Sequence, residues 1–158
     1  MTDPKELILL VQNIVEQAMA LRDKHTSETS APVNYACIFT QSNEEYEKFL
    51  IIARTLGSVV HETNMGPVFR IRPLTTIAGD LELLKIRKPD PKRPERGDAD
   101  FTLSDYQTFK NTYLHTPGFG IIARENMEMI ELSDPNFNVL AYFSHPMLFD
   151  VLKLKKLA

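Results

Sequence analysis

A chain of 158 residues, 43% hydrophobic and 25% charged, has the composition of a globular protein and can bury a core without disulfides. Its net charge of −3, from 18 basic and 21 acidic residues, supplies no positive field, which argues against binding to nucleic acid or an anionic membrane. The single cysteine, Cys37, excludes an intramolecular disulfide and zinc sites built from several thiolates.

The first predicted element is a helix that begins after Asp3-Pro4, an N-cap followed by proline at the first helical position. Its apolar residues recur at helical spacing and form one stripe, which consists of Leu7, Leu10, Val11, Ile14, Val15, Ala18 and Leu21. The helix should end near Asp23–His25, so residues 1–30 are predicted to be an N-terminal helix and linker. We expect the stripe to dock on the protein's own sheet or on a second subunit.

A strand, a helix and three further strands are predicted next, between residues 33 and 88. The expected strands are Val33–Phe39, Ser58–Thr63, Val68–Ile71 and Leu81–Ile86. Ser42 and Glu45 form a capping box at the start of the helix, and Gly57 marks its end.

A connector with three prolines, Lys88–Gly97, follows and suits neither a helix nor a central strand. After it the same order restarts, with a helix that begins at Ser104 or Asp105 and ends near Tyr113. The expected strands are Ala99–Leu103, Phe119–Arg124, Glu128–Leu132 and Val139–Phe143. The predicted division is a two-module domain over 31–158, with modules at 33–88 and 98–146, a Pro-rich joint at 89–97 and a C-terminal tail at 147–158.

Two similar stretches support this repeated order. Val59–Met65 reads VVHETNM, and Ile121–Met127, 62 residues later, reads IIARENM. Phe39–Ser42 matches Phe101–Ser104 at the same offset, and a shared period across several elements is typical of a repeated unit. The predicted fold class is therefore α+β, with two tandem βαβββ modules forming a curled mixed sheet, preceded by an N-terminal helix.

With this order, and with Asn64-Met65-Gly66 after the second strand, the chain resembles the vicinal oxygen chelate superfamily. That superfamily includes glyoxalase I, bleomycin-resistance proteins and extradiol dioxygenases, and within it the chain is most similar to the YecM-type proteins. Those proteins also carry an N-terminal helical segment and a Pro-rich joint. The resemblance covers residues 33–146 and implies that each module curls into half a barrel whose concave face holds a ligand or a metal ion.

The resemblance also implies where metal ligands would lie, namely early on the first strand and on the fourth strand of each module. The matching positions are Tyr35, Asp98 or Asp100, Glu82 or Lys85, and Val139 or Tyr142. Since neutral tyrosine is a poor ligand and valine is none, we expect no cofactor and no tightly held metal. If a metal is present, the candidate ligands are Glu82, Asp100, His61 and Glu128, and such an oxygen-rich set suits Mn²⁺ or Mg²⁺.

Strand periodicity indicates which side chains face a ligand. Asp98 and Asp100 alternate with Ala99 and Phe101, so both carboxylates should lie on the concave face if the apolar pair meets the helices. The alternative for Asp98 is a solvated end of the connector.

Three further residues complete the candidate ligand-binding set. Tyr35 would give the cavity wall a hydroxyl, Arg70 could bind an anionic group, and Tyr142 lies at the matching place on the last strand. The alternative for Arg70 is a solvated sheet face.

We therefore expect a small-molecule-binding protein whose pocket is lined by Tyr35, Arg70, Asp98, Asp100 and Tyr142. One alternative is a divalent-metal-dependent isomerase, lyase or dioxygenase acting on a small oxygenated substrate. Another is a structural module that pairs as a homodimer through exposed strand edges. Neither nucleic acid nor membrane is an expected partner, because acidic residues interrupt the basic run 85–96 and no apolar stretch could span a bilayer. No signal peptide is recognisable, so a cytoplasmic location is expected.

Overall fold

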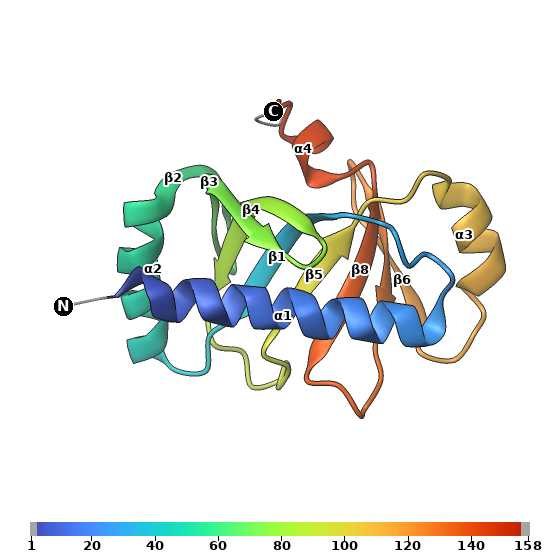
Figure 1. Ribbon diagram of the computed structural model, residues 1–158, viewed down its shortest axis with the longest axis horizontal. Coiled ribbons are helices and arrows are strands. Elements are labelled where there is room, and N and C mark those ends of the chain that lie inside the picture. The colour runs from blue at the N-terminus through green and yellow to red at the C-terminus, as the bar shows by residue number, and fades with distance from the viewer. Residues whose placement is uncertain (1–2, 156–158) are drawn as a thin grey trace.

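The computed structural model describes residues 3–155, and in this part eight strands form one mixed sheet with four helices around it (Figure 1). The helices are α1 (Pro4–His25), α2 (Asn43–Leu56), α3 (Tyr106–Tyr113) and α4 (Leu148–Val151). The strands are β1 (Val33–Phe39), β2 (Gly57–Thr63), β3 (Gly66–Thr76), β4 (Gly79–Arg87), β5 (Gly97–Phe101), β6 (Phe119–Ala123), β7 (Glu128–Leu132) and β8 (Val139–His145).

The predicted fold class is confirmed. The strand order is β2-β3-β4-β1-β5-β8-β7-β6, so each βαβββ module supplies one half of the sheet. Within each half the first strand pairs in parallel with the fourth, and the halves join through the antiparallel pair β1–β5. No helix within residues 3–155 is long and apolar enough to cross a membrane.

Equivalent positions on the two first strands are 63 residues apart, one more than the 62 that the sequence suggests. Ser42 caps α2 and Asp105 caps α3, and Ala36 lies directly opposite Ala99 in the register. Phe39 consequently faces the concave side whereas Phe101 lies in the core under α1. The match of Phe39–Ser42 with Phe101–Ser104 is thus out by one residue, which reverses the face of every side chain on a strand.

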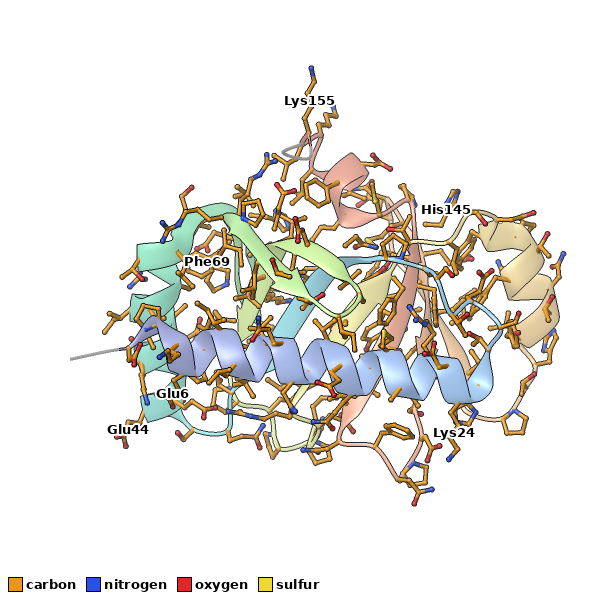
Figure 2. All side chains as sticks on the ribbon, viewed as in Figure 1. Glu6, Lys24, Glu44, Phe69, His145 and Lys155 are labelled. Carbon is orange, nitrogen blue, oxygen red and sulfur yellow. The ribbon has the colours of Figure 1, made fainter. Side chains whose placement is uncertain are left out.

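Helix α1 docks on one face of the sheet and spans both modules (Figure 1). Its inward residues are each at most 1% exposed, and they are Leu7, Val11, Ile14, Val15, Ala18 and Leu21. Ion pairs hold both ends, since Glu6 pairs with Lys48 on α2, and Lys24 with Asp134 in the turn after β7; Figure 2 shows Glu6 and Lys24 at opposite ends of the helix. The apolar stripe therefore finds its partner within the same chain.

The connector between the modules is held by ion pairs. Arg96 donates to both carboxylate oxygens of Glu45, at 2.6 and 2.8 Å, and to the carbonyl oxygen of Phe39 at 3.0 Å. Burial alone would raise the pKa of Glu45, but the bonds from Arg96 and from the backbone of Gln41 hold it below its usual value. The connector ends at Gly97 beneath α1, where an added Cβ would lie 2.3 Å from the carbonyl oxygen of Cys37.

Replacing Arg96 by alanine should lower the free energy of unfolding by about 1.5–3 kcal/mol, because three charge-assisted hydrogen bonds are lost. Lys92→Ala is the matched control, since Lys92 is an exposed cation of the same connector, and its effect should stay within about 0.5 kcal/mol. Urea unfolding of both variants measures the difference. Equal effects would show that the pair with Glu45 contributes nothing specific.

The C-terminal segment crosses the opposite face of the sheet from α1. Helix α4 places Phe149, 2% exposed, against Val68 and Leu83 on the half of the concave face that belongs to the first module. Figure 2 shows Lys155 at the end of this segment, away from α1. This segment covers part of the concave face and leaves the remainder open.

Candidate functional site

The concave face contains a cavity of about 530 Å³, a size typical of small-molecule sites. Apolar wall residues include Phe39, Met65, Val68, Ile122, Met127, Met129 and Leu148. Polar and charged wall residues include Tyr35, His61, Lys85, Arg87, Arg93, Asp98, Asp100, Tyr142 and Ser144. The wall draws on both modules, and its apolar residues lie among a larger number of groups that can form hydrogen bonds.

The register of the sheet fixes the order of these groups along the wall. One row runs from Lys85 on β4 through Cys37 on β1 to Asp98 on β5. The next row runs from Tyr35 through Asp100 to Tyr142. The alternation predicted for β5 holds, because Ala99 and Phe101 are buried in the core on the α1 side and both carboxyl groups face the cavity.

Asp100 is anchored by its neighbours. Its carboxylate accepts hydrogen bonds from the side-chain amide of Asn34 at 3.1 Å and from the backbone N–H and the hydroxyl of Ser144. Burial raises its pKa to about 6, and the bonds from Ser144 and Asn34 limit that rise. In the described part of the chain no hydrogen bond joins Asp100 to Tyr35, and its partners are Ser144 and Asn34.

Asp98 differs from Asp100 because, among residues 3–155, its carboxyl group forms neither a hydrogen bond nor an ion pair, although it is only 7% exposed. Burial, followed by the nearby charge of Asp100, raises its pKa to about 8, while Lys85 and Arg87 act in the opposite direction. The charge of Glu131, which accepts a hydrogen bond from the hydroxyl of Tyr142, also raises the pKa of Asp98. Asp98 therefore keeps its proton at neutral pH while no cation is beside it, and a cationic group placed next to it would lower this pKa and favour the carboxylate.

The thiol and the two phenols of the wall stay protonated as well. Burial raises the pKa of the Cys37 thiol well above its ordinary value, which argues against a nucleophilic thiolate. Burial likewise raises the pKa of Tyr35 and of Tyr142, whose hydroxyl donates to Glu131 at 2.5 Å. The wall therefore offers hydrogen-bond donors and no activated nucleophile among these groups.

Arg70, one of the ligand-binding candidates, lies outside the cavity wall. Its guanidinium pairs with Glu82 at 3.0 Å, stacks 5.7 Å above the ring of Phe149 and donates to the carbonyl oxygen of Lys155. The C-terminal segment covers this pair. The structure therefore brings together Tyr35, Asp98, Asp100 and Tyr142, but not Arg70, and ligand binding by any of them stays a prediction.

The four candidate metal ligands are dispersed. Only His61 and Asp100 line the cavity, because Glu82 is paired with Arg70 and Glu128 faces α3, where it binds Tyr106 at 2.7 Å. Within residues 3–155 no group of three or more His, Cys, Asp or Glu side chains is arranged to hold a metal ion. The residues present do not fit the metal site that the resemblance implies.

The sequence also contains a signal for two further wall residues. Met65 and Met127 are the last residues of the two similar stretches, and both line the cavity from the turns that follow β2 and β6. Their shared place in the repeat could have identified them as wall residues. Ser144, in contrast, carries no signal, because its bond to Asp100 depends on the pairing of β5 with β8.

Comparisons with known proteins bear on the fold alone. No protein-family model matches the chain, and no curated protein matches it significantly. A solved structure described as "Structural Genomics, Protein EC4020" is similar with a TM-score of 0.74 and 13% identity, over 96% of this chain and 93% of its own. A glyoxalase/bleomycin resistance protein/dioxygenase superfamily member from Vibrio splendidus 12B01 has a TM-score of 0.45 and 10% identity, over 72% of this chain and 97% of its own. The first similarity shows that nearly the whole fold occurs in another protein, and a fold does not by itself specify a ligand.

Proposed function

We propose that the chain is a small-molecule-binding protein of the vicinal oxygen chelate type that does not use that superfamily's metal ligand set. The observation that carries this proposal is the cavity of about 530 Å³, in which the carboxyl groups of Asp98 and Asp100 lie among apolar side chains from both modules. Ligand sites combine apolar surface with polar groups that orient the ligand, and this wall contains both, with the polar residues in the majority.

The dispersed carboxylates support a binder over a divalent-metal enzyme. His61 and Asp100 are the two candidate ligands on the wall, and Asp100 already accepts hydrogen bonds from Ser144 and Asn34. Two protein ligands would hold Mn²⁺ or Mg²⁺ weakly. Elemental analysis of untagged, dialysed protein tests this part of the proposal. A near-stoichiometric metal that is lost in Asp100→Ala would contradict it and favour the isomerase, lyase or dioxygenase.

Placing a larger side chain in the cavity should weaken small-molecule binding. Ile122 lines the wall, whereas its neighbour Ile121 is 43% exposed and absent from the wall. Ile122→Trp should therefore weaken fragments found by fluorine NMR screening at least about tenfold, the equivalent of 1.4 kcal/mol. Ile121→Trp adds the same group to the same strand outside the cavity and should leave affinities unchanged. Equal effects, or a screen without any wall-binding fragment, would contradict the proposed function.

A further inference from the structure

We infer that the ligand of this cavity is a small zwitterion, whose ammonium group binds Asp98 and whose carboxylate lies beside Lys85. The inference rests on the proposed small-molecule function and adds the chemical class of the ligand. It starts from two wall residues of opposite charge type that lie close together without pairing.

Asp98 supplies the first half of the argument. Its carboxyl group is 7% exposed, faces the cavity and has no hydrogen-bond or ion-pair partner among the described residues. A carboxyl group that is buried without a partner is unfavourable, so such groups normally have one. Asp100 beside it has three hydrogen bonds from Asn34 on β1 and Ser144 on β8, which shows that the neighbouring strands provide partners where the folded chain itself needs them. The partner of Asp98 is therefore expected to come from the ligand.

Lys85 supplies the second half. Of the basic residues on the wall, Arg87 pairs with Asp90 and Arg93 with Glu131. Arg124 is exposed at the rim. Lys85 is partly buried, and in the part of the chain that the structure describes its ammonium group forms no ion pair or hydrogen bond. It is the inward-facing cation that remains available for an anionic group.

The sheet register fixes the spacing of these two groups. Cys37 lies directly between them, opposite Lys85 on one side and opposite Asp98 on the other. Two strand spacings separate the Cα atoms of Lys85 and Asp98 by about 10 Å. The protonated thiol between them contributes no charge. A ligand with its two charges a few bonds apart can contact both residues at once, whereas a ligand with one charge would leave the other residue without a partner.

A series of short amino acids tests the inference. The probes are β-alanine, 4-aminobutanoate and 5-aminopentanoate, compared with butanoate and butylammonium, which each carry one of the two charges. Chemical-shift titrations of nitrogen-labelled protein measure the affinities. At least one zwitterion should bind about tenfold or more tightly than both singly charged analogues, because it alone pairs with Asp98 and Lys85 together.

Two variants assign the charges to their partners. Asp98→Asn should remove the preference for the zwitterion over butanoate, and Lys85→Met should remove the preference over butylammonium. The matched controls are Asp80→Asn and Lys88→Met, which make the same changes at exposed positions outside the wall and should preserve both preferences. Since the analogue series is measured on the unmodified protein, the inference stays testable even if a variant fails to fold.

The outcomes separate the inference from the proposed function. Singly charged or neutral fragments that bind the wall as tightly as every zwitterion would overturn the zwitterion assignment and leave small-molecule binding intact. The same holds if wall-binding fragments are found but none of the zwitterions binds. If neither fragments nor zwitterions bind, both proposals fail.

Discussion

Replacing Ile14 and Leu21 together by alanine should lower the free energy of unfolding by about 4–10 kcal/mol, because each large-to-small change in a packed core removes about 2–5 kcal/mol. Both side chains are at most 1% exposed and lie between α1 and the sheet. Domains of this size are stable by about 5–15 kcal/mol, so the double variant should be largely unfolded at room temperature. Circular dichroism during urea unfolding measures the change.

Leu9→Ala is the matched control for this prediction. Leu9 belongs to the same helix but is 59% exposed, so its removal should change the free energy of unfolding by no more than about 0.5 kcal/mol. A double variant as stable as Leu9→Ala would show that α1 does not dock on the sheet in solution.

Asp98→Asn should make the protein more stable than the parent at pH 8, by about 3–5 kcal/mol. In the folded protein the pKa of Asp98 is raised to about 8, from an ordinary value of 3.8. Below about pH 4 the carboxyl is protonated in both the folded and the unfolded state. Between pH 4 and pH 8 only the unfolded chain releases the proton, so the parent loses up to about 1.4 kcal/mol per pH unit. Asparagine does not titrate and should lack this loss.

The measurement is the difference in free energy of unfolding between Asp98→Asn and the parent at pH 4, 6 and 8. The difference should be small at pH 4 and should grow with pH. Asp80→Asn removes the same charge at an exposed position and controls for the change in net charge. If Asp98→Asn and the parent lose the same stability from pH 4 to pH 8, Asp98 is not the buried acid that the structure indicates.

The element order could be predicted because it depends on local patterns. The stripe of α1 repeats every turn, Ser42 and Glu45 mark the start of α2, and the three prolines of the connector exclude regular structure. The side of the sheet to which each β5 side chain points could also be predicted, because Asp98 and Asp100 alternate with apolar residues. These signals lie within a few residues of the structure that they specify.

The rest depends on contacts between distant residues, which local patterns do not contain. Glu128 and Glu131 both lie on β7, but only the pairing with β8 and the position of α3 show that Glu131 meets Tyr142 while Glu128 faces away. The cover over Arg70 comes from the C-terminal segment, 79 residues further along the chain at Phe149. Pairs that form across such separations leave no periodicity in the sequence.

The residues at equivalent positions of β1 and β5, the first strands of the two modules, bear on how a ligand could lie in the cavity. Positions 63 residues apart are equivalent in the two modules, so Tyr35 corresponds to Asp98 and Cys37 to Asp100. If the equivalent residues were alike, a ligand could turn end over end and make the same contacts in both poses. Here each equivalent pair joins a phenol or a thiol to a carboxyl group, so the two poses differ in energy. A small molecule that binds as proposed should therefore prefer one of the two orientations.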